Sequence, residues 1–344
     1  MIAVGCASSV RPSAIPAPLS SSGPSELVQE APELTSDEKT LKKALERHLG
    51  HLSEKIGERN PKQLWELAET ADYIAAELEG MGYPLERQGY ETEEVAAQNI
   101  AVTVPGGMRG DEVLLVGAHY DSPAGSRGVN AGASGTAALL ELARIMRGAQ
   151  LTRSLRFVFF AMGESPHGDD EARGARHFAR KLKEESQRTS TQEAALSGLN
   201  VSQRVTMGLI QLDRLGSFRG ASATSLRSPQ SRGSVVVRLT VSPGAELLRS
   251  SIADALTGDH VRVQEALFAP FVASQADSDV AAFFEQGIKG ISVSGDGASA
   301  ESVKDLDTTE TARIVMRLRR GIGQIVGEKM INDAMLTPSG VGMR

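Results

Sequence analysis

The most chemically informative residues of this chain are a His-x-Asp pair at the end of an apolar run. Residues 113–118 read Val-Leu-Leu-Val-Gly-Ala, and His119 and Asp121 follow directly. A turn rich in Gly and Ser comes next, and the small-residue segment 128–135 then opens an apolar helix. Imidazole and carboxylate groups are good zinc ligands. Because α/β folds build their sites at the carboxyl ends of strands, this pattern indicates a metal site.

Strand-like and helical segments alternate along the chain and would position this pair. Thr35 and Glu38 have the spacing of a capping box, so a helix is expected to begin there. Asn60-Pro61 is expected to cap and open a second helix. The expected strands are 85–90, 98–104, 113–118, 155–161, 206–212, 235–239 and 288–293. Further helices are expected over 136–147, 173–183, 245–256 and 279–285, and long surface loops over 184–203 and 219–233.

This alternation predicts an α/β protein with three layers, α/β/α, around a central mixed and mostly parallel sheet. The chain has 344 residues, of which 40% are hydrophobic and 23% charged, as in an ordinary globular protein. Residues 1–34 are rich in Ser, Pro and Ala and are expected to be disordered. A single folded domain is expected over 35–336, followed by a flexible tail over 337–344.

Charge and hydropathy argue against two classes of partner. The net charge of -6 offers no basic field for a phosphate backbone, so nucleic acid is not expected as a partner. No apolar run approaches the ~20 residues that cross a bilayer, so no transmembrane segment is expected.

Cys6 is the single cysteine, which excludes an intramolecular disulfide. Ala-Val-Gly-Cys at 3–6 resembles a bacterial lipoprotein cleavage site, which makes Cys6 a candidate for lipidation. Only five residues precede Cys6, whereas an export signal needs an apolar core of ~7–15 residues. Two alternatives stay open. Either the true start lies upstream and the protein is exported, periplasmic or lipid-anchored, with 1–34 as a tether, or the match is chance and the protein is cytoplasmic.

The segments around His119 and Asn130 resemble the zinc-binding core of metallopeptidase family 28, the di-zinc aminopeptidases. Members carry Gly-Ala-His-x-Asp-Ser followed by Gly-Ala-Asn-Asp-Asn-Ala-Ser-Gly. Further motifs match in order, including Arg-Phe-Val-Phe-Phe at 156–160 and Ser-Asp-x-x-x-Phe at 278–283. The resemblance implies a zinc-exopeptidase, phosphorylase/hydrolase-like fold. It also implies an ancestral activity that removes N-terminal residues from peptides, with a cleft for a peptide or a small aminoacyl ligand.

The resemblance assigns metal-ligand positions to His119, Glu164 and Asp213. In the family, one zinc is held by the His and a later carboxylate, the other by a Glu and a late His, and an Asp bridges both. Asp121 is placed to accept the second ring N–H of His119 and so to fix its tautomer.

Three family positions are lost. Ala131 stands where the family has the bridging Asp, and Gly163 stands where it has the general-base Glu. The loop 295–307 lacks the late His ligand. Asn130, His167 and Asp170 are the nearby candidates for substitute ligands, although the amide oxygen of Asn130 is a weak zinc ligand with turn chemistry as its better-supported task.

These losses predict weak or partial zinc binding and a catalytically impaired member of the family, a pseudopeptidase. Loss of a positioned base alone typically costs ~10²–10⁴-fold in rate. One alternative is an active zinc aminopeptidase with an altered, mononuclear site that uses His167 or Asp170. Another is a non-catalytic protein that binds peptides or a partner in the cleft.

Overall fold

One mixed sheet of eight strands organises the chain. The computed structural model describes residues 32–92, 96–164, 172–190, 204–218, 235–258, 260–268, 278–297 and 299–329. The strands are β1 (Glu86–Glu91), β2 (Ala96–Val104), β3 (Gly106–His119), β4 (Leu151–Phe160), β5 (Val205–Asp213), β6 (Val235–Val241), β7 (Val261–Leu267) and β8 (Gly290–Gly295). Their order in the sheet is β1-β2-β4-β3-β5-β8-β6-β7.

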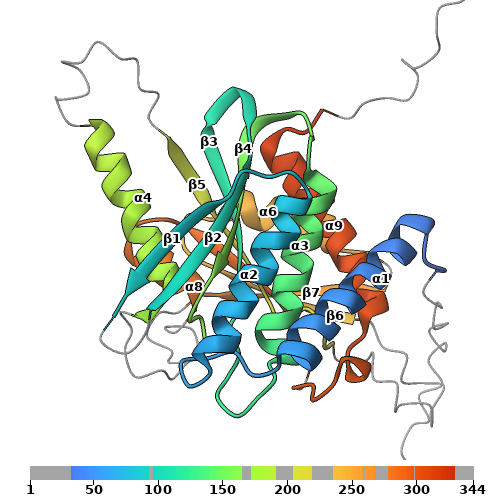
Figure 1. The fold of residues 1–344 in the computed structure, drawn as a ribbon. Helices are drawn as coiled ribbons and strands as arrows, with labels where there is room; N and C mark the ends of the chain where they lie inside the picture. The colour runs from blue at the N-terminus through green and yellow to red at the C-terminus, as the bar shows by residue number, and fades with distance from the viewer. Residues whose placement is uncertain are drawn as a thin grey trace, which may run out of the picture.

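Helices cover both faces of the sheet. They are α1 (Ser36–Leu49), α2 (Leu64–Gly80), α3 (Ser134–Met146), α4 (Gly174–Ser190), α6 (Glu246–Leu256), α8 (Asp279–Glu285) and α9 (Thr308–Val326), with short helical segments η1 (Gly50–Ile56), η2 (Val129–Ala133) and η6 (Val303–Asp305). Helices α1, α2, α3, α6 and α9 lie on one face, and α4 and α8 lie on the other (Figure 1). The predicted three-layer α/β/α fold is therefore confirmed.

The central strands run parallel, which brings their carboxyl ends to one edge. Strand β3 pairs in parallel with both β4 and β5, and β5 pairs in parallel with β8. In this register His119 lies opposite Phe160, and Asp213 lies opposite Ser294. These strands are apolar along their buried length because helices cover both of their faces. Side chains that follow these strands consequently gather at the same edge.

The two predicted helix starts have different outcomes. Helix α1 begins after Thr35, whose hydroxyl accepts the backbone N–H of Glu38 in a capping box, as predicted. Helix α2 begins at Leu64, so the prediction that Asn60-Pro61 opens it is wrong. The side-chain oxygen of Asn60 instead accepts the N–H of Lys62 over 3.0 Å and closes a separate turn.

Two other predictions need correction. Helix α4 continues to Ser190, so the predicted loop 184–203 is wrong over its first seven residues. Strand β7 was not predicted, because Arg, Gln and Glu interrupt its apolar residues and leave most of it exposed at the edge of the sheet.

Cys6 and the predicted loop 219–233 lie outside the described residues. None of the described helices has the length and hydropathy needed to cross a membrane.

Candidate functional site

His119 lies between two carboxylates at the carboxyl edge of the sheet. Its Nε2 is 3.5 Å from Oδ1 of Asp213, at the end of β5, and 3.6 Å from Oε1 of Glu164, in the turn after β4. The imidazole and the Glu164 carboxyl are buried, whereas Asp213 retains some contact with solvent. The structure thus brings the three predicted ligand positions together around one imidazole nitrogen.

Asp121 connects β3 to the turn that carries Glu164. Its carboxylate accepts the backbone N–H groups of Gly163 and Glu164 over 2.7 and 2.9 Å. Its Oδ1 also lies 3.3 Å from Nδ1 of His119, in an ion-pair contact without the geometry of a directed hydrogen bond. Asp121 therefore orients the imidazole by charge and holds the Glu164 turn by hydrogen bonds.

The electrostatic balance of this group favours a charged imidazole. Burial alone would lower the pKa of His119, but Asp121, Asp213 and Glu164 together hold this pKa well above its usual value. Burial raises the pKa of Glu164 despite the nearby His119. Asp213 is held below its usual pKa by His119 and Arg214, which outweigh the effect of its burial. The carboxylates around His119 therefore favour its protonated form.

The backbone is strained at both turns that carry these carboxylates. Met162 has a φ of 59° and Arg214 has a φ of 49°, and both are in the left-handed region that side chains other than Gly rarely adopt. No other non-glycine residue in the described part of the chain has a positive φ. Such strain costs about 1–3 kcal/mol per residue and concentrates at functional sites. The two turns are therefore held in place by their surroundings.

Gly132, next to the position where a bridging Asp is expected, has no room for a side chain. Gly132 has a φ of 85°, and a Cβ atom placed on it would lie 1.9 Å from the carbonyl oxygen of Asp121. Ala131 precedes it at a kink in η2. The Oδ1 of Asn130 accepts the N–H of Gly216 over 3.0 Å and the hydroxyl of Ser134 over 3.3 Å. This amide oxygen joins two loops, in agreement with a turn-forming role for Asn130.

Gly163 packs directly against His119. A Cβ atom placed on Gly163 would lie 2.3 Å from the Cβ atom of His119 and 2.6 Å from its Cγ atom. These distances are far below ordinary van der Waals contact, so a side chain at this position requires movement of the imidazole or of the turn. The position predicted for a general base therefore has no room for a side chain in this arrangement.

The described residues do not form a complete zinc centre. Among the residues that the structure describes, no group of three or more His, Cys, Asp or Glu side chains is arranged to hold a metal ion. Oε1 of Glu164 is a buried oxygen without a hydrogen-bond partner among the described residues, and its nearest described positive group is the imidazole of His119. His167 and Asp170, the candidate substitute ligands, lie outside the described residues.

Asp279 belongs to the same region and was not predicted as a site residue. It is the first residue of α8, is almost fully buried, and accepts a hydrogen bond from Nε2 of Gln211 over 3.0 Å. Burial raises its pKa to about 6, although His119 and Arg173 act in the opposite direction. The Ser-Asp pair at 278–279 marks a helix start in the sequence, but nothing local shows that this Asp is buried beside β5.

Comparison with known proteins identifies the family. The model of Peptidase family M28 matches residues 99–313, which is more than half of the chain. Leupeptin-inactivating enzyme 1 of Streptomyces exfoliatus is 34% identical over 95 residues, which make up 27% of this chain and 22% of that protein. Aminopeptidase YwaD of Bacillus subtilis is 32% identical over 73 residues, or 21% of this chain and 16% of that protein. The matched segments thus span about a fifth of these relatives.

Solved structures share the fold over nearly the whole chain. BSAP, a zinc aminopeptidase from Bacillus subtilis, superposes with a TM-score of 0.60 at 13% identity, over 86% of this chain and 96% of that structure. The glutaminyl cyclase of Macrostomum lignano superposes with a TM-score of 0.61 at 16% identity, over 88% and 96%. At these identities the likeness concerns the fold alone. Together with the match of the family model, the arrangement of β3, β4, β5 and their end-of-strand side chains leads to one conclusion: the chain belongs to peptidase family M28.

Proposed function

We propose that this chain is a catalytically impaired member of peptidase family M28, descended from aminopeptidases, which keeps the site's framework without a working di-zinc centre. The observation that carries the proposal is the contact between Gly163 and His119, which leaves no space for a base. Ala131 adds the loss of a group that could bridge two metals. Proton transfer needs a base at position 163 and metal bridging needs a carboxylate at position 131, and the chain has Gly163 and Ala131 there.

The surviving side chains support at most weak zinc binding. His119, Glu164 and Asp213 are the residues that would donate to an ion, and zinc would supply a polarised carbonyl and an activated water in such a site. In this chain the imidazole contacts both carboxylates directly. The chain offers these three donors and no bridging carboxylate, which lowers the affinity expected for an ion. We therefore expect partial occupancy in zinc-replete medium.

A peptide or an aminoacyl compound remains the expected ligand of the cleft. Arg214 is half exposed beside Asp213 and Glu164, with its side-chain nitrogens 3.9 Å from each carboxylate. The partly exposed carboxylate of Asp213 at this strand edge suits the ammonium group of an N-terminal residue. The protein would then bind such ligands without cleaving them.

Two measurements on the purified full-length chain test the proposal. Metal analysis after growth with zinc is expected to give well under one equivalent per chain. Hydrolysis of leucine p-nitroanilide with added zinc is expected to equal that of a Glu164→Ala control. Two tightly held zinc ions, or robust hydrolysis that Glu164→Ala abolishes, would refute the proposal and favour an altered working site that includes residues outside the described ranges.

A further inference from the structure

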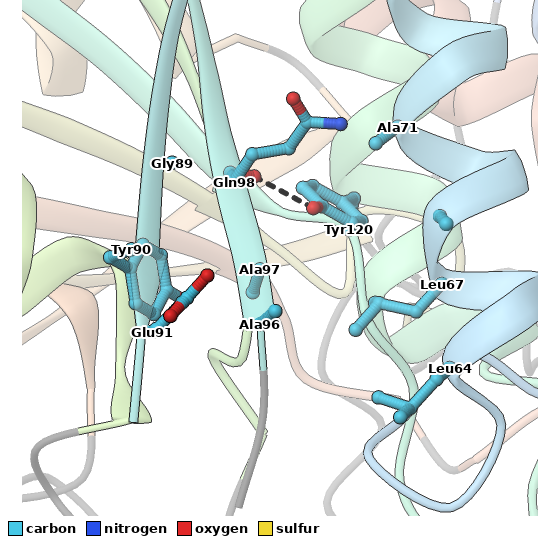
Figure 2. Close-up of a pocket in the computed structure, with 11 residues that line it drawn as sticks. Leu64, Leu67, Ala71, Gly89, Tyr90, Glu91, Ala96, Ala97, Gln98 and Tyr120 are labelled. Carbon is cyan, nitrogen blue, oxygen red and sulfur yellow. Dashed lines mark hydrogen bonds between the residues drawn. The ribbon is translucent and has the colours of Figure 1, made fainter. Parts of the chain in front are cut away.

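A pocket separate from the His119 group lies between α2 and the β1–β2 hairpin. It has a volume of about 620 Å³. Its walls are the apolar side of α2, the inner face of the hairpin and the ring of Tyr120, as Figure 2 shows. Small-molecule sites typically occupy about 300–1,000 Å³ and are mostly apolar with a few polar groups. The pocket has the size and composition of such a site.

The apolar wall comes from one stripe of α2. Leu64, Leu67, Ala68 and Ala71 recur at helical spacing and face the hairpin. The side chains of Leu64 and Leu67 point toward β2 (Figure 2). Leu64 is 48% exposed, which is unusual for a Leu at the start of an amphipathic helix that packs on a sheet. Part of this stripe therefore faces the pocket and not the protein core.

The hairpin leaves the space open because Gly89 has no side chain. Gly89 pairs with Gln98, and Glu91 pairs with Ala96, so these four residues form the floor. A Cβ atom placed on Gly89 would meet no atom within 4 Å. A larger residue here would fill the pocket without a clash, so no packing requirement within the described residues accounts for the glycine.

One charged side chain faces this apolar space. Among the lining residues only Glu91 carries a charge, and it forms no ion pair with any described residue. The hydroxyl of Tyr120 is already used, since it donates to the carbonyl oxygen of Gln98 over 2.7 Å (Figure 2). Arg87 lies on the same face of β1, and its guanidinium is 3.5 Å from the carboxylate of Asp72 on α2. Arg87 therefore pairs with Asp72 and not with Glu91. The pocket thus offers an unpaired carboxylate beside an apolar wall.

We propose that this pocket binds a small amphipathic cation, a primary ammonium group with an aliphatic or aromatic body. The ammonium group would pair with Glu91 at the mouth, and the body would lie over Gly89 against Leu64 and Leu67. An anionic ligand of the same shape would meet the Glu91 charge and be disfavoured. The proposal does not depend on whether the chain hydrolyses peptides, because Tyr120 and His119 are consecutive strand-end residues whose side chains project to opposite sides.

The test uses three probes of equal chain length: n-hexylammonium, n-hexanoate and 1-hexanol, each titrated into the full-length protein by calorimetry or ligand-observed NMR. The ammonium is expected to bind at least about tenfold more tightly than the carboxylate, a difference of about 1.4 kcal/mol. Glu91→Gln should bring the ammonium close to the alcohol and leave the alcohol unchanged. Glu79→Gln, an exposed change on α2 away from the pocket, serves as the matched control and should change nothing.

Gly89→Val tests the location of binding. Valine suits a strand, and its side chain would occupy the floor, so the fold should persist while the affinity for the ammonium and the alcohol falls at least tenfold. Gly89→Ala should give a smaller loss, and thermal unfolding checks that both variants are folded. Equal affinity for hexylammonium and hexanoate in the wild type, absence of binding, or binding that survives Gly89→Val in a folded protein would each overturn the proposal.

Discussion

Nε of Arg59 donates a hydrogen bond to the carbonyl oxygen of Tyr120, 3.0 Å away, and so fixes the backbone between His119 and Asp121. The Arg59 side chain is completely buried. Its remaining N–H groups donate to the carbonyl oxygens of Leu52, Gly57, Arg127 and Gly128. Burial lowers its pKa to about 10, but the guanidinium stays charged at neutral pH. One cation thus ties η1 to both ends of the turn that follows β3.

Replacement of this cation should destabilise the protein strongly. In Arg59→Met five carbonyl oxygens lose their donor, three of them in buried contacts, and each unsatisfied buried group costs about 1–3 kcal/mol before relaxation. We expect the free energy of unfolding, measured by urea denaturation, to fall by about 3–5 kcal/mol. Arg127→Met is the matched control, because the Arg127 side chain is exposed and only its backbone takes part. Equal stability of the two variants would contradict this role.

Much of the fold could be predicted because its determinants are local. The capping box of Thr35 and Glu38 lies within four residues, and the apolar run that ends at His119 marks a strand by itself. The start of α2 was predicted wrongly because the Asn60 side chain can cap a turn as well as a helix. Only tertiary packing decides which of the two forms.

The site could be predicted only in part. His119, Glu164 and Asp213 stood out because they follow strands in a known motif. The partners of Arg59 and Asp279 did not, because hydrogen bonds across more than 60 residues leave no pattern in the sequence. The contact of Gly163 with His119 likewise leaves no pattern in the sequence, although it decides whether position 163 can accept a larger side chain.

Introduction of the Glu that the family resemblance predicts at position 163 should fail for steric reasons. Gly163→Ala already places a Cβ atom 2.3 Å from that of His119, so we expect a loss of about 1–3 kcal/mol in the free energy of unfolding. Gly163→Glu should cost at least as much and should yield no peptidase activity with zinc, alone or together with Ala131→Asp. Thermal unfolding and the leucine p-nitroanilide assay measure both effects. Activity in Gly163→Glu would show that the turn can move aside.

The buried carboxyl of Asp279 should weaken the fold at neutral pH. Its folded-state pKa of about 6 lies above the ordinary 3.8, so the unfolded chain releases this proton first as the pH rises. Stability is consequently lost between about pH 4 and pH 6, by up to about 3 kcal/mol. Asp279→Asn keeps an oxygen for Gln211 and removes the titration. The variant should match the wild type near pH 4 and exceed it at pH 7 in urea unfolding, and a difference independent of pH would contradict this account.

Glu141 should show the opposite dependence on pH, because its charge is paired. It is completely buried in α3, 3.2 Å from Nε2 of His48, and it accepts a hydrogen bond from Nε of Arg144 over 2.8 Å. Burial alone would raise its pKa, but these partners hold the pKa below its usual value. Its contribution to stability is therefore present above the ordinary carboxyl pKa and is lost as the pH falls through the lower folded-state value.

Glu141→Gln removes this charge at nearly constant volume and leaves Arg144 without its anion. The carboxylate is buried but the Arg144 side chain is 43% exposed, so we expect a loss of about 1–3 kcal/mol at pH 7. The loss should shrink as the pH falls below the ordinary carboxyl pKa, since the unfolded wild-type chain then takes up a proton at Glu141 before the folded protein does. Urea unfolding at pH 7 and pH 3.5 measures this, with Glu79→Gln as the exposed control. A loss that persists undiminished at low pH would mean that shape, and not charge, makes Glu141 stabilising.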